Sequence, residues 1–232
     1  CIRDRAKSDA NIHHDGYKTV LLGLRNTAEI AMLGLLIGIV FGTVIATTRV
    51  IPRTNPVAKF FSGLSGLYVG LFRGTPIVVQ LLVFYYVLMP LMNLHMNSVA
   101  VAVVVFGMNS AAYISEIMRA GILSVDSGQM EGGRAIGLNY ATTMMKIVIP
   151  QAVKNILPTL GNEFISLIKE TSVVSFVGAM DLYVAFNRIG SNSYEFMIPY
   201  LVMALIYIVI VLVITLGIKL MERSLRKSDK SI

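Results

Sequence analysis

The chain has 232 residues, of which 55% are hydrophobic and only 14% are charged, and its mean hydropathy is +0.71. Because a soluble domain carries about 25% charged residues, this composition excludes an ordinary soluble fold and favours several helices that face lipid. The net charge of +7 comes from basic residues between and after apolar runs, which indicates orientation in a membrane rather than nucleic-acid binding.

A polar segment of mixed charge precedes the first apolar run. We expect residues 1–26 to form an extracytoplasmic leader, in which residues 12–25 are mildly amphipathic and either lie on the membrane surface or lead directly into the first span. Cys1 is the only cysteine, so an internal disulfide is excluded. The adjacent His13 and His14 are interpreted as solvated residues of this leader, not as a metal site.

The first predicted span runs from Thr27 to Thr48. Its glycines recur at every fourth position, at Gly34, Gly38 and Gly42. This spacing of small residues lets another helix approach closely.

The next apolar run, residues 60–94, is long for one span and contains the sequence Arg-Gly-Thr-Pro at residues 73–76. Glycine and proline at this point should break or bend the helix. We therefore predict a surface or partial helix up to Phe72, and a second span from Pro76 to about Met92.

Three further spans are predicted at residues 98–118, 157–177 and 196–220. The polar stretch 119–155 is too charged for lipid but is patterned like short helices, and residues 181–194 are expected to form a loop.

The predicted fold is an all-α membrane protein with five transmembrane helices within residues 27–220, followed by a basic cytoplasmic tail at residues 221–232. Basic residues predict that the N-terminus is outside and the C-terminus is cytoplasmic, because this orientation places twelve of them inside and six outside. The inner residues are Arg49, Arg53, Lys59, Arg119, Arg134, Lys146, Lys154, Lys219, Arg223, Arg226, Lys227 and Lys230. The outer residues are Arg3, Arg5, Lys7, Lys18, Arg25 and Arg188.

The most specific motif lies in the polar stretch 119–155. Glu131 is followed after six residues by Gly137, after ten more by Ile147 and after three more by Pro150. This spacing resembles the cytoplasmic loop motif, called the EAA motif, of ABC importer permeases. The resemblance implies a short helix that seats in a cleft of a separate ATPase and receives force from it. Gly137 is expected to allow the tight turn after this helix.

Three positions depart from that motif. Gly132 and Gly133 stand where the family usually has alanine, and Ile149 stands where it usually has leucine. Each glycine weakens a helix by about 1 kcal/mol. The coupling residues implied by the resemblance are Glu131, Gly132, Gly133, Ala135 and Gly137. The alternative is an ordinary surface helix-turn-helix.

Other segments resemble the permeases of polar amino acid importers. They are Phe72-Arg73-Gly74-Thr75-Pro76 with Gln80, Ala112 to Arg119, Gly161 to Phe164, and Lys169 to Ser172. The resemblance extends over residues 27–220 and implies a type I ABC importer permease in a bacterial-type cytoplasmic membrane. It also implies a dimer with an identical or related permease subunit, ATPase subunits that bind ATP and Mg²⁺, and a solute-binding protein, free or fused upstream. No cofactor is expected in this chain.

Polar residues inside spans are costly in lipid and usually face a pathway or bond to one another. Asn109, Tyr113 and Glu116 share one face of the third span. A second stripe in the fourth span is formed by Thr159, Glu163, Ser166 and Glu170. These stripes either line a cavity or hold helices together.

By the same resemblance, the substrate is held partway across the membrane. Glu163 would bind the ammonium or a cationic side chain, and Asn109, with Ser110 or Ser166, would bind polar groups. Arg73 is a weaker candidate for the carboxylate. The competing interpretation is a structural Glu163, protonated or paired with Lys169.

The sequence contains no P-loop, no H-E-x-x-H and no G-x-S-x-G, so neither ATP binding nor covalent catalysis is expected of this chain. A secondary transporter driven by an ion gradient would show inverted repeats, which five spans do not provide. An intramembrane enzyme would need a nucleophile and a base or a metal site.

Overall fold

The computed structural model describes residues 2–51 and 55–227, and the side chains of residues 16–51 and 55–225. Every regular element in these ranges is helical. In chain order the elements are α1 (Ile2–Val50), α2 (Pro56–Gly74), α3 (Ile77–Val83), the π-helical turn η1 (Phe84–Leu88), α4 (Met89–Leu91), α5 (Ser98–Leu123), α6 (Ser127–Ala135), α7 (Tyr140–Thr143), the π-helical turn η2 (Met144–Val148), α8 (Ile149–Glu170), the 3₁₀ helix η3 (Thr171–Val177), α9 (Leu182–Ser193) and α10 (Met197–Lys227).

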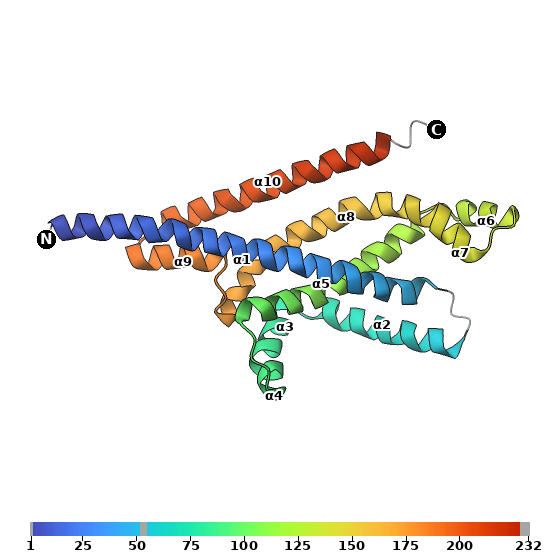
Figure 1. The fold of residues 1–232 in the computed structure, drawn as a ribbon, viewed down its shortest axis with the longest axis horizontal. Coiled ribbons are helices and arrows are strands. Elements are labelled where there is room, and N and C mark those ends of the chain that lie inside the picture. Colours follow the sequence, from blue (N-terminus) through green and yellow to red (C-terminus); the bar gives the residue numbers. More distant parts are fainter. Residues whose placement is uncertain (1, 52–54, 228–232) are drawn as a thin grey trace.

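The helices form an elongated bundle with two distinct ends (Figure 1). One end, called here the α6 end, carries α6, α7, the end of α1, the start of α2 and the end of α10 (Figure 1). The opposite end carries α9 and the beginning of α1 (Figure 1). In the described residues, three helices are long and apolar enough to cross a membrane, and up to five spans result if each of two bent pairs counts as one. The predicted number of five is the larger of these counts.

The long helix α1 supplies the first span. It has no break near residue 26, so the described part of the predicted leader continues into the span as one helix, and the candidate span begins at Gly16. A Cβ atom on Gly38 would lie 2.8 Å from the Ser110 hydroxyl, and one on Gly42 would lie 2.9 Å from Ile114. The glycines of α1 therefore allow the close contact with α5 that their spacing predicts.

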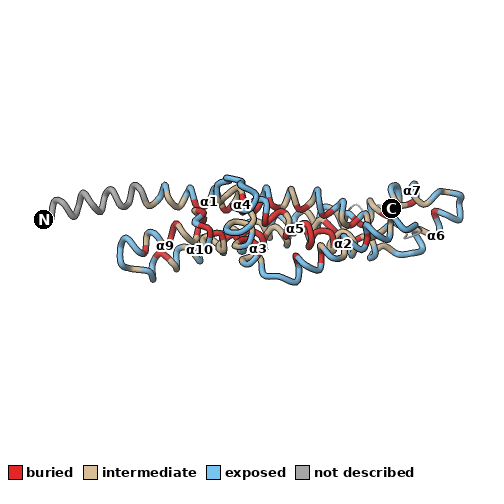
Figure 2. Tube along the Cα trace, turned by 90° about the horizontal axis from the view of Figure 1, so that it is seen from below, coloured by how far each residue is buried: buried red, intermediate tan, exposed pale blue. Residues whose placement is uncertain are grey.

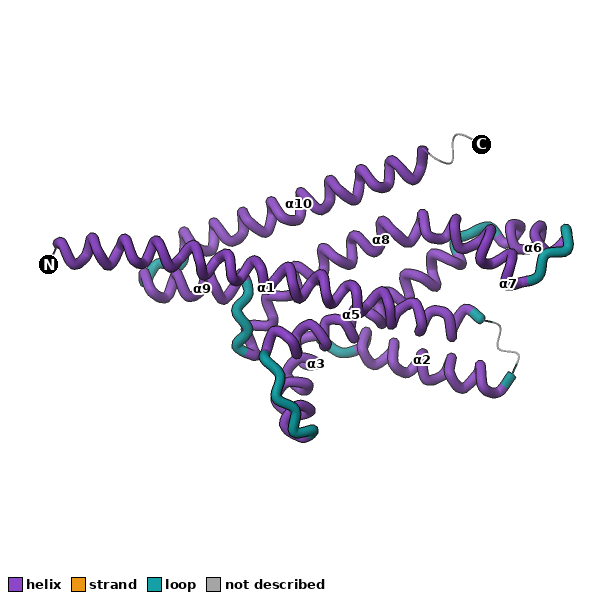
Figure 3. Tube along the Cα trace, viewed as in Figure 1, coloured by secondary structure: helices purple, strands orange, loops and turns teal. Residues whose placement is uncertain are grey.

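The predicted break in the second apolar run is confirmed. Helix α2 ends at Gly74, α3 begins at Ile77, and the two directions differ by 104°. The segment from α3 to α4 projects away from the bundle (Figure 3). Proline explains the break, because Pro76 has no N–H to continue the helix.

The prediction of a loop at residues 181–194 is wrong, because most of this segment is the helix α9. Asp181 caps the helix by accepting a hydrogen bond of 2.8 Å from the Val184 N–H. Leu182, Ala185 and Phe186 are buried at helical spacing, and α9 packs against α1. The many polar residues of α9 concealed this apolar face. The fourth span also differs from the prediction, since its helix begins at Ile149.

Buried residues form a core along the length of the bundle, between α1, α5 and α8 (Figure 2). Its largest cluster includes Ile30, Leu81, Phe106, Leu167 and Val174. By contrast, the most apolar 18-residue stretch of α10 has no buried residue, so most of its surface is left for lipid or for a partner. The predicted basic tail is described only as far as Lys227, where α10 ends.

Candidate functional site

The middle of α5 carries two adjacent polar residues that contact different helices. The Ser110 hydroxyl donates a hydrogen bond of 3.1 Å to the Glu163 carboxylate of α8. The Asn109 amide donates to the Phe72 carbonyl at 3.3 Å and to the Gln80 side-chain oxygen at 3.0 Å. The predicted pair of Asn109 and Glu163 thus lies on one short stretch of the bundle, but each residue has its own partner.

Gln80 of α3 completes the contacts at the corner between α2 and α3. Its amide nitrogen donates to the Phe72 carbonyl at 2.8 Å and to the Thr75 carbonyl at 3.0 Å. In a continuous helix the Phe72 carbonyl would accept from residue 76, but Pro76 has no N–H. The amides of Gln80 and Asn109 therefore satisfy a buried carbonyl that the proline leaves without its helical partner.

A strip of α5 between α2 and α8 is open to solvent at Tyr113, which is 36% exposed. Tyr113 follows Asn109 by four residues and Ser110 by three, so it lies on the helix face between them. The Arg73 guanidinium of α2 lies over the Tyr113 ring, 5.3 Å from its centre. A basic residue of α2 and an acidic residue of α8 thus lie on the two sides of this strip.

Ser166 follows Glu163 by three residues on α8, and its side chain is half-buried. Two large cavities lie elsewhere. One of about 540 Å³ lies between the end of α8 and α10 and is lined by Lys169 and Tyr207. The other, of about 480 Å³, lies between α1 and the start of α5 and is lined by Arg25 and Asn97. The predicted substrate residues line neither of them.

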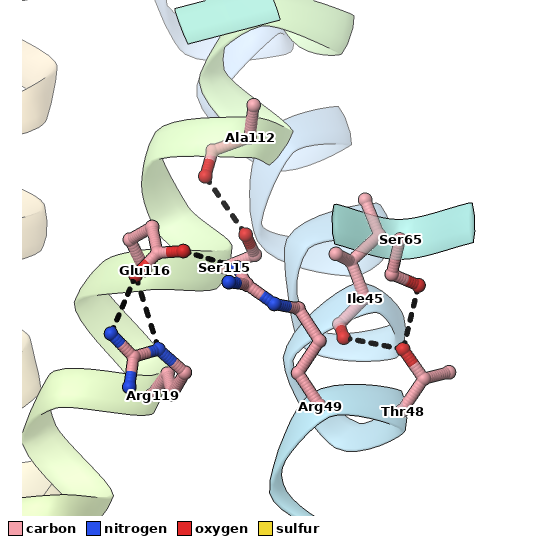
Figure 4. Close-up of polar contacts among 8 residues, drawn as sticks. All are labelled: Ile45, Thr48, Arg49, Ser65, Ala112, Ser115, Glu116 and Arg119. Carbon is pink, nitrogen blue, oxygen red and sulfur yellow. Dashed lines mark hydrogen bonds and ion pairs between the residues drawn. The ribbon is translucent and has the colours of Figure 1, made fainter. Parts of the chain in front are cut away.

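Glu116, in the same polar stripe of α5, forms a structural joint (Figure 4). Its carboxylate pairs with Arg49 of α1 and, at 3.0 Å, with Arg119 of α5. Nearby, the hydroxyls of Thr48 and Ser65 lie 2.7 Å apart and connect α1 to α2 (Figure 4). Glu116 therefore holds helices together. The other two residues of this polar stripe, Asn109 and Tyr113, lie at the open strip of α5.

The predicted coupling helix exists as α6. The Asp126 side chain caps its start by accepting a hydrogen bond of 2.7 Å from the Gly128 N–H. At its end, Gly137 has φ = +90°, which favours glycine. The N–H groups of Gly137 and Leu138 donate to the carbonyls of Arg134 and Gly133 at 3.0 and 3.1 Å. This pair of bonds is a Schellman motif, so Gly137 ends the helix as the sequence predicts.

The two glycines inside α6 differ in their surroundings. A Cβ atom on Gly133 would lie 2.5 Å from the Thr143 side chain of α7, whereas nothing lies within 4 Å of the same position on Gly132. Gly133 is therefore needed where α6 meets α7, and Gly132 belongs to the outer face. Glu131 and Ala135 are also exposed on that face. Ile136 is an apolar residue with 78% exposure at its end.

Close contacts join α5 to α8 beside α6, and one side-chain contact joins α6 to α8. The Asn155 amide donates to the Ser124 hydroxyl at 2.9 Å, which ties the start of α8 to the end of α5. A Cβ atom on Gly121 would lie 2.3 Å from Ile156, so the two helices almost touch. The Gln151 and Gln129 side chains are 3.2 Å apart. The contact between Gln151 and Gln129 thus links α6 to α8, and the close contacts between α8 and α5 connect the two spans.

Sequence reasoning did not assign roles to Gln80, Arg49 or Arg119. Gln80 was detectable in part, because Pro76 identifies Phe72, four residues earlier, as a carbonyl that needs another donor. Arg49 was not detectable as a partner of Glu116, because it is distant in sequence, whereas Arg119 follows Glu116 by three residues and lies on the same helix face.

Comparison with known proteins places this geometry in a family. The family described as "Binding-protein-dependent transport system inner membrane component" matches residues 34–227. The chain belongs to this family. The permease is 36% identical over 210 residues to the arginine transport system permease protein ArtQ of Bacillus subtilis (strain 168), covering 90% of this chain and 94% of that one.

Two other relatives agree with this assignment. The permease is 34% identical to the putative glutamine transport system permease protein GlnP of Rickettsia prowazekii (strain Madrid E), covering 89% of this chain and 92% of that one. A crystal structure of an amino acid ABC transporter with histidines matches with a TM-score of 0.82 and 36% identity, covering 90% of this chain and 94% of that one. The predicted family and the type I importer permease fold are confirmed.

Proposed function

We propose that the permease forms the translocation pathway of an ATP-driven importer for a polar amino acid, and that α6 couples this pathway to a separate ATPase subunit. The observation that carries the proposal is α6 itself. It matches the motif in sequence, lies at one end of the bundle with Glu131 and Ala135 exposed, and is joined to two spans. The names of the relatives, which refer to arginine and glutamine transport, support the class of substrate.

Force transfer follows from the contacts of α6. Its outer face is free to seat in a cleft of the ATPase, while Gly133 holds its inner face against α7. The contacts at Gly121 and Ser124 tie α5 to α8, so a movement that passes from α6 to α8 through Gln129 and Gln151 would also reach α5. ATP and Mg²⁺ bind to the partner ATPase in this proposal, and the permease itself carries no cofactor.

The substrate is proposed to bind at the open strip of α5. A polar amino acid carries an ammonium and a carboxylate, and a buried charge needs an opposite charge or hydrogen bonds. Glu163 faces the strip from α8 and Arg73 from α2, which suits the two ends of such a zwitterion. Asn109, Ser110 and Ser166 supply further hydrogen-bonding groups.

The proposed assembly contains two permease subunits, identical or related, two ATPase subunits at the α6 end and a solute-binding protein at the opposite end. The exposed face of α10 is available for lipid or for the second permease subunit. The bias in basic residues supports a cytoplasmic α6 end in the inner membrane. A cysteine introduced at residues 139–143 should react only from the cytoplasm, and one at Ser191 only from outside. Labelling of the first in intact cells would contradict this orientation.

The function is tested by co-purifying the permease with the ATPase encoded beside it and reconstituting the complex in liposomes. Amino acids, presented with their binding protein, should stimulate ATP hydrolysis and enter the liposomes only with ATP. A surface variant at the opposite end, Glu29→Gln, serves as a matched control, because its ion pair with Arg25 is exposed and 4.0 Å long. Uptake that follows an ion gradient without ATP would refute the importer function.

A further inference from the structure

The corner between α2 and α3 determines which way the Asn109 amide faces. A carbonyl oxygen only accepts hydrogen bonds, so the atoms that approach the Phe72 carbonyl from Gln80 and Asn109 must both be amide nitrogens. The Gln80 side-chain oxygen then faces the Asn109 nitrogen at 3.0 Å. The Phe72 carbonyl, a backbone group that cannot flip, therefore fixes the orientation of both the Gln80 and the Asn109 amides.

In this arrangement the side-chain nitrogen of Asn109 donates hydrogen bonds at the corner, and its side-chain oxygen remains available as an acceptor. Gln80 is 7% exposed and Asn109 is 4% exposed, so neither amide is held by bulk water. The Asn109 oxygen can only accept a hydrogen bond, and an ionised carboxylate at Glu163 is also an acceptor. A ligand that contacts both groups must present hydrogen-bond donors, such as the N–H groups of an ammonium or a guanidinium.

We propose that Gln80 is a positioning residue, which holds Asn109 as an acceptor in the substrate site and so favours substrates that present an ammonium or guanidinium there. This inference rests on the proposed function and adds a source of specificity to it. Gln80 acts through Asn109 and does not touch the substrate. Without Gln80, the Asn109 amide loses one of its two partners at the corner and can turn its nitrogen toward the substrate.

The test uses the complete transporter in liposomes, with labelled arginine, glutamine and glutamate as probes. Gln80→Met keeps the length of the side chain and removes its hydrogen bonds. We expect the KM of the best cationic or neutral probe to rise about tenfold with a maximal rate within about twofold, and the preference for that probe over glutamate to fall. Thr75→Val is the matched control, because it removes one acceptor of Gln80 at 2.9 Å and leaves the bond to Asn109.

Thr75→Val should lower thermal stability and leave KM within about twofold of the wild type. Gln80→Glu, which as a neutral acid offers one donor and one acceptor, should restore most of the affinity. An equal rise in KM for Gln80→Met and Thr75→Val would overturn the proposal, since it would reflect only a weakened corner.

A double-mutant cycle separates positioning from direct contact. Asn109→Ala should raise KM, and adding Gln80→Met should change it by less than about twofold more. Fully additive effects, or an unchanged KM in Asn109→Ala, would overturn the inference and leave the importer function standing. Asn109→Ala keeps the inference open to refutation even if the Gln80→Met variant fails to assemble. ATP-dependent uptake of no probe by the wild type would instead overturn the proposed function, and this inference with it.

Discussion

The α6 end of the bundle and the middle of α5 both gather polar side chains, but in different ways. At the α6 end, Glu116 has two arginine partners, and both connections of α6 are held by close contacts. In the middle of α5, Glu163 accepts one hydrogen bond, from Ser110, beside an open strip. The first region suits transmission of movement, because its charges are satisfied within the chain. In the second region the partner of the carboxylate is a hydroxyl, which supports the proposed role of Glu163 in ligand binding.

The same contrast separates interactions that stabilise the fold from interactions that recognise a substrate. A carboxylate with two guanidinium partners contributes to stability, and its loss leaves a cation without its partner. A carboxylate with a single hydroxyl partner retains much of its binding capacity. Four predictions test the two regions, from the largest expected effect to the smallest.

Gly137→Asp should abolish transport. A side chain at φ = +90° is strained, and the added charge lies at the turn that ends α6. Because this turn is exposed and far from the core, the protein should still insert and assemble. The measurements are uptake in liposomes and membrane content by immunoblot. Normal uptake by this variant would show that α6 does not transmit force as proposed.

Glu116→Gln should destabilise the permease by about 3 kcal/mol, because Arg49 and Arg119 lose a largely buried partner. Thermal unfolding in detergent measures the effect. Glu29→Gln, which removes an exposed ion pair, should cost at most about 1 kcal/mol. The KM of the transported amino acid should stay the same in both variants. A shift in KM for Glu116→Gln would erase the distinction between the two regions.

Glu163→Gln should change recognition with little loss of stability. The substitution keeps the shape and the hydrogen bond to Ser110 but removes the charge. We expect KM to rise about tenfold for an amino acid with a cationic group at this site, and the choice among basic, neutral and acidic amino acids to change. Competition uptake assays measure both. Unchanged affinity together with unchanged selectivity would show that Glu163 is structural.

Gly132→Ala should have the smallest effect, a gain in stability of at most about 1 kcal/mol, because the site is open and alanine favours the helix. Gly133→Ala should act in the opposite direction, since its Cβ would meet the Thr143 side chain at 2.5 Å. Thermal unfolding of the two variants gives the comparison. Equal effects would mean that α6 is not packed tightly against α7.

Local chemistry made several elements predictable from the sequence. Apolar length identified the spans, Pro76 predicted the break after α2, and the glycine spacing of α1 predicted a close helix contact. Gly137 predicted the end of α6, because only a few residues tolerate a positive φ. The motif around Glu131 resembled that of the family in its spacing, in its place in a polar loop and in the spans around it.

The helix α9 was not predictable in this way, because its second half is mostly polar and its stability depends on burial against α1. The same limit applied to the two glycines of α6, since only the position of Thr143 distinguishes them.

The sequence by itself determined the membrane class, the order of the helices and the family, because these follow from hydrophobic length and from residue spacing along one chain. The tertiary structure decided which polar residues pair. Glu116 meets Arg49 across 67 positions of sequence, and Ser110 meets Glu163 across 53. Such pairs form only when helices pack, and the packing determines whether a buried charge is satisfied inside the protein or remains for a ligand.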